Sequence, residues 1–221
     1  MNKKTEFLMD SFKLLQDFDH INLPDVAAFD KDFGKAVLIR KSEIYYHLLY
    51  EWSNNLGKMI YEMFITAKIF PALIVTRELL SQSSIFFCFV QAIEKNVKVR
   101  NLDSLERDAT RLFLHNLSEN PTFGDLTIGQ CFDQVNEKFN GARVAFNQIG
   151  DAILPLRRGF SLHDDGADIQ DINLDNLVDK DESPLDIGAK CLFYSLVILT
   201  HSYGRLEIAF PQLVRVALGL R

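Results

Sequence analysis

The sequence predicts an all-α fold, an antiparallel helical bundle, on three observations. Apolar residues recur at spacings of three and four over long stretches. Gly and Pro are few, 11 and 6 in 221 residues, and no stretch reads convincingly as a strand. An apolar content of 48% with a net charge of −6 provides a large core and excludes wholesale disorder. We expect one bundle domain over residues 41–221, preceded by a helix and a connecting arm in residues 1–40.

Six helices are expected, at residues 5–18, 42–70, 72–95, 103–117, 127–154 and from Pro184 onward. Ser42, Thr127 and one of Asp103 or Ser104 are the expected N-caps. For the helix at 42–70, one face is predicted to enter the core: Ile44, Leu48, Trp52, Leu56, Met59, Met63, Ala67 and Phe70.

Prolines and glycines set the expected breaks. The residue before a proline avoids helical geometry, so Pro71 is predicted to mark a boundary or kink, and Pro155 is predicted to bend or end its helix. Pro211 is predicted to kink the end of the last helix. Gly141 and Gly150 are expected inside the helix at 127–154, where they mark close helix contacts.

The last helix carries the most regular pattern, with spacings of four and three from Leu185 to Phe210. Its stripe consists of Leu185, Ala189, Leu192, Leu196, Leu199, Tyr203, Leu206 and Phe210, and Phe193, Val197 and Ile208 widen it. Such a stripe is typical of a helix within a bundle, and it is also the pattern with which two subunits pack together. Both interpretations stay open at this level.

Cysteine spacing and hydropathy indicate a cytoplasmic protein without a membrane span. Cys88, Cys131 and Cys191 are odd in number and far apart, as expected of buried free thiols in a reducing compartment. The most apolar stretch, residues 69–93, contains Arg77, Glu78 and several serines, so it falls short of a membrane helix. No cofactor-binding motif occurs, and no cofactor is expected.

Charge is concentrated in one acidic loop, residues 164–182, which carries eight carboxylates and one lysine. No Lys/Arg block suits duplex DNA. Within this loop, five residues lie at calcium-loop spacing: Asp171, Asn173, Asp175, Asp179 and Glu182. Pro184 interrupts the helix that should follow a calcium loop, so a loop without metal is favoured and no metal is expected.

The run from Arg157 to His163 is the most suggestive chemical feature. A neutral histidine can accept the proton of a ribose 2′-hydroxyl, and an arginine can stabilise the phosphorane that forms. Arg158 and His163 are therefore a candidate catalytic pair for RNA cleavage without a metal. On an ideal helix, five residues turn by about 500°, so the pair would lie about 140° apart. Arg158 and His163 could reach the same phosphate only if the helix bends or if a second subunit supplies one of the two residues.

The surroundings of this run resemble the HEPN superfamily of helical domains. The resemblance rests on residues 74–80 (IVTRELL), 123–130 (FGDLTIGQ) and 156–164 (LRRGFSLHD). A related stretch occurs in the HEPN-like mannitol operon repressor family. The resemblance covers roughly residues 42–210 and implies a HEPN-like bundle that forms a homodimer.

If the family role carries over, the chain is a toxin- or defence-type ribonuclease that acts on RNA and has an antitoxin or other protein partner. Arg158 and His163 would be catalytic, supported by Arg157, Asp164, Arg77 and Glu78. Catalytic members have Asn, Asp or His after the motif arginine, whereas this chain has Gly159. That departure and the acidic loop favour a second hypothesis, a non-catalytic regulatory or protein-interaction module.

Arg77 and Glu78 have a structural alternative to a site role. Arg77 continues a stripe formed by Leu73, Leu80, Ser84 and Phe87, so it is expected to be partly buried. A charge on a core face needs a partner, and an ion pair or network between helices is the favoured interpretation. The histidines His47, His115 and His201 have no neighbouring ligands in sequence and are expected at core edges or on the surface.

Overall fold

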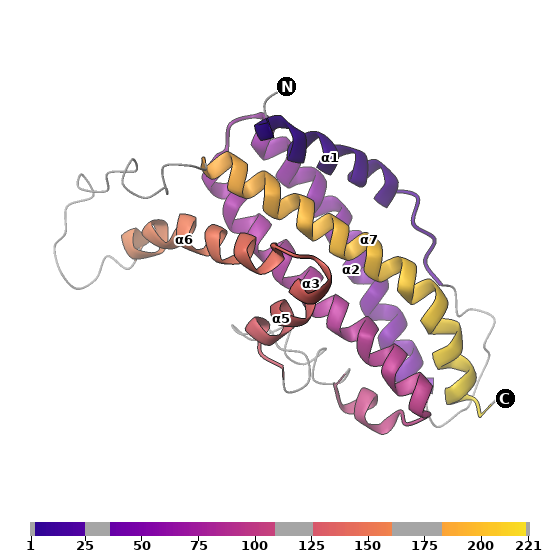
Figure 1. Cartoon of the computed structure of the whole chain (residues 1–221). Helices are drawn as coiled ribbons and strands as arrows, with labels where there is room; N and C mark the ends of the chain where they lie inside the picture. The colour runs from indigo at the N-terminus through magenta and orange to yellow at the C-terminus, as the bar shows by residue number, and fades with distance from the viewer. Residues whose placement is uncertain (1–2, 25–35, 109–125, 161–182, 220–221) are drawn as a thin grey trace.

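The chain is all-α, as the sequence predicts. A computed structural model describes residues 3–24, 36–108, 126–160 and 183–219, and these contain no strand (Figure 1). The helices with defined bounds are α1 (Lys3–Phe18), α2 (Ala36–Ile65), α3 (Ile69–Val99), α5 (Ile128–Lys138), α6 (Ala142–Phe160) and α7 (Pro184–Ala217). Residues 103–108 start a further helix between α3 and α5.

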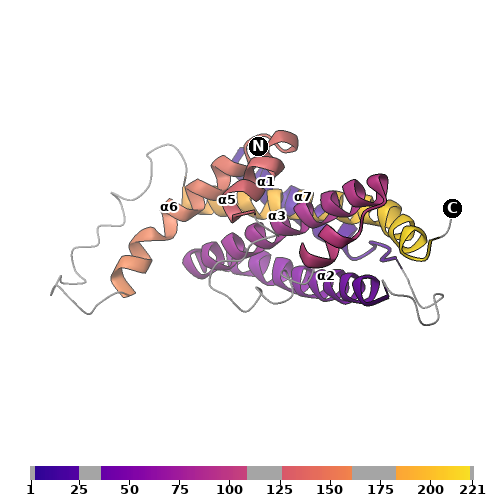
Figure 2. The same ribbon diagram turned by 90° about the horizontal axis from the view of Figure 1, so that it is seen from below.

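Two long helices, α3 and α7, lie side by side along the length of the molecule and form its centre (Figures 1 and 2). Helix α7 also contacts α1, α2 and α6, and α3 also contacts α2, α5 and α6. Helix α1 packs into the same core, where Leu15 and Phe18 are buried. The other helices therefore form two groups on this central pair, α1 with α2 and α5 with α6.

The stripe on α7 is buried within the chain. Seven of its eight residues are at most 1% exposed, and Leu185 is half-buried. This confirms the interpretation as a bundle helix and contradicts the alternative that part of the stripe packs on a second subunit. Ile208 is 68% exposed and does not widen the stripe as expected. Pro211 lies inside the helix, which continues beyond it to Ala217.

Helix α2 differs from its prediction in two respects. It begins at Ala36, so Ser42 is a buried residue within the helix and not its N-cap. The face predicted to enter the core points largely outward, with Ile44 52% and Leu48 60% exposed. The buried face carries Leu38, Ile39, Ser42, Tyr45, Tyr46, Leu49, Ser53, Gly57, Ile60 and Phe64. Its serines, tyrosines and glycine made this face look less apolar in sequence than the outward face.

Helix α3 follows its prediction closely. Leu73, Leu80, Ser84 and Phe87 are fully buried, and Arg77 is half-buried. Among the described helices, α3 is the one long and apolar enough to cross a membrane, but 72% of its most apolar window is buried in the bundle. The boundary near Pro71 is confirmed, because α2 ends at Ile65 and Pro71 lies in the first turn of α3, where proline is tolerated.

The helix expected at 127–154 is two helices. Thr127 is the N-cap, as predicted, but α5 ends at Lys138 and α6 begins at Ala142. Gly141 lies in the turn between them with φ +94°, a conformation that costs glycine little. Helix α6 continues through Pro155 to Phe160, so this proline does not end it.

The helix that starts at residue 103 is not capped by either residue that the sequence suggests. Asp103 is itself helical, and Ser104 donates a hydrogen bond to Asn96 Oδ1 at 2.7 Å. Neither residue is therefore the N-cap that the sequence predicts. The three cysteines are free and buried, as predicted.

Aromatic rings fill the core where α1, α2, α3 and α7 meet. Tyr203 packs against the rings of Phe18, Tyr50 and Phe86, and its hydroxyl donates to the Tyr46 carbonyl at 2.9 Å. Burial raises the pKa of Tyr203 well above its usual value because the phenolate would be desolvated. The buried hydroxyl has a partner, so this large residue is accommodated without an unsatisfied donor.

Candidate functional site

The arginine run of the candidate site lies on the described end of α6. Arg157 and Arg158 are both within the helix, two and three residues beyond Pro155. His163 and Asp164 lie outside the described residues, as do the calcium-type loop residues Asp171, Asn173, Asp175, Asp179 and Glu182 and the histidine His115. Of the proposed pair, the structure therefore describes only the position of Arg158 in α6, and the contacts described below hold the first half of that helix.

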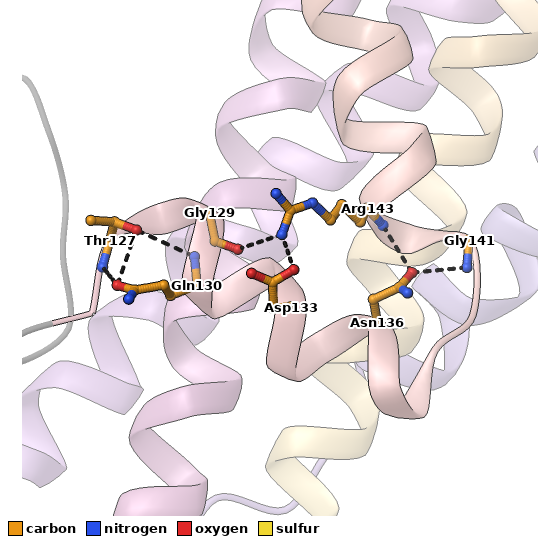
Figure 3. A network of polar contacts seen from close by, with 7 residues as sticks. All are labelled: Thr127, Gly129, Gln130, Asp133, Asn136, Gly141 and Arg143. Carbon is orange, nitrogen blue, oxygen red and sulfur yellow. Dashed lines mark hydrogen bonds and ion pairs between the residues drawn. The ribbon is translucent and has the colours of Figure 1, made fainter.

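A polar network fixes the turn that precedes α6 (Figure 3). Asn136 Oδ1 accepts hydrogen bonds from the backbone nitrogens of Gly141, at 3.1 Å, and Arg143, at 3.4 Å. One amide side chain thus satisfies two backbone donors at the start of α6, where a helix has no internal acceptors for them. The turn between α5 and α6 is held from the α5 side.

Arg143 joins the two helices a second time. Its Nη1 donates to the Gly129 carbonyl at 3.2 Å and forms an ion pair with Asp133 (Figure 3). At the other end of α5, Thr127 and Gln130 form a capping box, in which Gln130 Oε1 accepts from the Thr127 nitrogen at 2.8 Å. Helices α5 and α6 therefore form one stable hairpin.

Helix α7 makes three hydrogen bonds to α6 and to the turn that precedes it. Tyr194 donates to the Asn140 carbonyl at 2.8 Å, Cys191 to the Ala145 carbonyl at 3.2 Å, and Lys190 to Gln148 at 3.3 Å. The Tyr194 hydroxyl lies 2.6 Å from where a Cβ on Gly141 would stand, so a larger residue at 141 would displace this contact. These contacts fix the first half of α6.

Arg77 holds α6 from the side of α3. Its guanidinium carbon lies 5.0 Å from the centre of the Phe146 ring, and its Nε lies 3.9 Å from where a Cβ on Gly150 would stand. A cation over an aromatic face is attractive, and the half-buried position strengthens it. Gly150 leaves room for the guanidinium, in line with the close contact expected at this glycine.

Glu78 takes no part in this contact. It is exposed, and its Oε1 accepts a hydrogen bond from Gln82, one turn further along α3, at 3.0 Å. Of the two residues, Arg77 joins α3 to α6 and Glu78 faces solvent. The described contacts therefore give Arg77 a packing role between two helices and place Glu78 on the surface.

The start of α7 is equally well fixed. Ser183 is its N-cap and forms a capping box with Asp186, and the Ser183 hydroxyl donates to Asp186 Oδ2 at 2.6 Å. One turn later, a Cβ on Gly188 would lie 2.7 Å from Phe64 Cε1 and 2.9 Å from Leu73 Cδ2. Glycine therefore permits α7 to approach α2 and α3 closely. Both helices that flank residues 161–182 are anchored in the bundle.

A charged cluster that the sequence did not indicate lies between α3 and α7. Arg205 Nε donates to Glu94 Oε1 at 2.8 Å, and its guanidinium lies 5.4 Å from the centre of the Phe87 ring. His201, one turn earlier on α7, contacts the rings of Phe87 and Phe139. Glu94 and Arg205 are 111 residues apart, so no local spacing could reveal the pair.

Burial is the main cause of a lowered pKa at His201, and the positive charges of Lys138 and Arg205 lower it further, while Glu94 opposes them. Its Nε2 is buried without a hydrogen-bond partner. The lowered pKa favours the neutral form of His201, which lies half-buried at the core edge as expected, and His47 packs on the neighbouring Tyr46 ring. No cluster of three potential metal ligands occurs among the described residues.

Comparisons with protein-family models, with curated proteins and with solved structures find no match to this chain. The fold class rests on the structure itself, and the function rests on the residues of the site.

Proposed function

We propose that this chain is a HEPN-like antiparallel helical bundle of the cytoplasm that cleaves RNA without a metal. In this proposal Arg158 stabilises the transition state and His163 acts as the base. The observation that carries it is the position of the arginine run near the C-terminal end of α6, a helix whose first half is fixed by α3, α5 and α7. An anchored helix is the kind of support that a catalytic side chain needs, because small displacements of a reacting group are costly.

The proposed reaction breaks one P–O bond by attack from within the RNA. His163 accepts the proton of a ribose 2′-hydroxyl, and the resulting oxygen attacks the adjacent phosphorus. The bond to the 5′-oxygen breaks, and that oxygen takes a proton from water. Arg158 stabilises the charge on the pentavalent intermediate. The products are a 2′,3′-cyclic phosphate and a 5′-hydroxyl, with no net oxidation or reduction.

A second candidate function is a non-catalytic interaction module. The observation that favours it is the placement of Arg77 and Glu78, because Arg77 packs on Phe146 and Glu78 bonds to its own helix. Two of the four residues proposed to support catalysis thus have structural contacts that account for them. Gly159 and the acidic loop point in the same direction, since the loop's negative charge repels phosphate.

The experiment that separates these functions is an RNA cleavage assay in excess chelator, with the wild-type chain, Arg158→Ala, His163→Ala and Arg215→Ala. Arg215 is exposed on α7, far along the chain from the arginine run, and serves as the matched control. We expect the first two variants to lose about 100-fold or more in rate, as for removal of a general base or a charge-stabilising donor. The Arg215 variant should keep its rate. A wild-type chain without activity, or equal loss in all three variants, contradicts the proposal, and inactivity favours the interaction module.

A further inference from the structure

Helix α2 carries an uncovered apolar stripe on its outward face. Its members are Ile44, Leu48, Trp52, Leu56, Met59 and Met63, and the name α2 stripe refers to these six residues below. Four are exposed, with Leu48 at 60% and even the large Trp52 at 38%, while Leu56 and Met63 are half-buried. Helix α2 runs along one edge of the bundle (Figure 2), so the stripe follows an outer edge of the molecule.

Among the side chains that the structure describes, this concentration is confined to one helix. Six large apolar side chains of α2 are exposed there, whereas each of the other helices exposes at most two. Single exposed apolar residues are ordinary, but a contiguous apolar patch marks an interaction surface. Spacings of four and three also suit packing against another helix. The stripe therefore has the form of a helix-binding face.

The charges at the two ends of the stripe have opposite signs. Arg40 is exposed near the start of α2, and Glu62 is exposed near its end. They are 22 residues apart, which places them about 33 Å apart along the helix and separated by only about 40° around it. Both therefore flank the same side of the stripe, and they are too far apart to pair within one chain.

This pattern matches its own copy in antiparallel orientation. Two α2 helices that run in opposite directions bring Arg40 of each copy to Glu62 of the other, whereas a parallel pair brings like charges together. The midpoint between the two residues is Glu51, next to Trp52. A two-fold axis there places Leu48 and Trp52 of both copies at the centre, where desolvated aromatic and aliphatic residues contribute most.

We propose that the α2 stripe is the contact surface for a second copy of this chain, packed antiparallel about a two-fold axis beside Trp52, with Arg40 of each copy paired to Glu62 of the other. The proposal does not depend on RNA cleavage. It places the contact on α2, since the stripe of α7 is buried within the chain. One feature opposes it: the exposed Glu51 meets its copy near the axis. Glu51 lies at the exposed flank of the stripe, where like charges cost little, so Glu51→Gln should tighten the dimer only slightly.

The first test measures solution mass by sedimentation equilibrium over micromolar to hundreds of micromolar chain. The wild-type chain should form a concentration-dependent dimer, and Leu48→Glu should sediment as a monomer with unchanged helical circular dichroism. Ile208→Glu is the matched control, because Ile208 is an exposed apolar residue on α7, and it should sediment as the wild type does. A wild-type monomer throughout, or a Leu48→Glu dimer of wild-type strength, overturns the proposal.

The second test reverses the charges. Arg40→Glu and Glu62→Lys should each weaken the dimer by roughly fivefold, because each substitution places like charges at two symmetric contacts. The double variant Arg40→Glu with Glu62→Lys restores opposite charges across the interface and should regain most of the wild-type affinity. Since the two residues cannot meet within one chain, this rescue can come only from an antiparallel pair. If the double variant dimerises more weakly than either single variant, the antiparallel arrangement is overturned.

Discussion

Helices α7 and α2 both carry long apolar stripes at spacings of three and four, but their surroundings differ. The α7 stripe lies at the centre of the bundle, in contact with α1, α2, α3 and α6, and is almost fully buried. The α2 stripe lies at an edge, and its most exposed member, Leu48, is 60% exposed. The same pattern thus forms an internal core on one helix and an outer face on the other. Periodicity identifies a face but not what covers it.

The largest effect expected from this comparison is on stability. Leu196 of α7 is fully buried, so Leu196→Ala should lower the free energy of unfolding by about 2–5 kcal/mol. Leu48→Ala on α2 should change it by no more than about 0.5 kcal/mol in dilute protein, as for an exposed residue. Urea unfolding at a concentration where the chain is monomeric measures both. Similar losses for the two variants would mean that the α2 stripe is covered within the chain.

A smaller effect tests how closely α7 packs at its start. Gly188→Ala should destabilise the chain by about 1–3 kcal/mol, because the new methyl group would overlap Phe64 and Leu73. Gly204, on the same helix, has nothing within 4 Å of an added Cβ, so Gly204→Ala should stabilise the chain by about 0.5–1 kcal/mol. Thermal unfolding of the two variants gives the comparison. A stabilising effect at 188 would show that the close approach of α7 is not rigid.

The smallest effect concerns pH at the edge of the α7 core. The pKa of His201 is lowered from 6.5 in the fold, chiefly by burial. Between its folded and unfolded pKa, His201 therefore binds more protons in the unfolded chain than in the folded chain, and stability should fall as pH drops below about 6.5. His201→Gln removes this contribution, so its unfolding free energy should fall less than that of the wild type between pH 7.5 and 5.5. Equal falls would contradict a lowered pKa at His201.

Much of the fold was predictable because it depends on local signals. The all-α class, the stripe of α7, the N-cap at Thr127 and the boundary near Pro71 all follow from spacing or capping chemistry. The α2 face was predicted wrongly because its buried side contains Tyr45, Tyr46 and Ser53, whereas its outer side is plainly apolar. Burial there depends on neighbouring helices, which no local pattern reveals.

The candidate site was less predictable for the same reason. Its arginine run could be found from sequence, but the contacts that hold α6 join residues far apart, such as Tyr194 with Asn140. The break at Gly141 depends on a positive φ and on the Asn136 side chain, and a glycine alone did not reveal it. The Glu94–Arg205 pair required the packing of α3 on α7 to be known.

A distance between two copies tests most directly whether the α2 stripe is a self-complementary surface. Spin labels at Glu51→Cys or Thr66→Cys can be attached selectively, because the three native cysteines are buried. In the antiparallel dimer, the labels at 51 should lie within about 10–20 Å, since packed helix axes are about 8–10 Å apart. Those at 66 should be about 45 Å apart or more, given 15 residues from the axis in each copy at about 1.5 Å per residue. Pulsed electron spin resonance that gives a short distance at 51 and a long one at 66 supports the account. Short distances at both positions, or none at 51, contradict it.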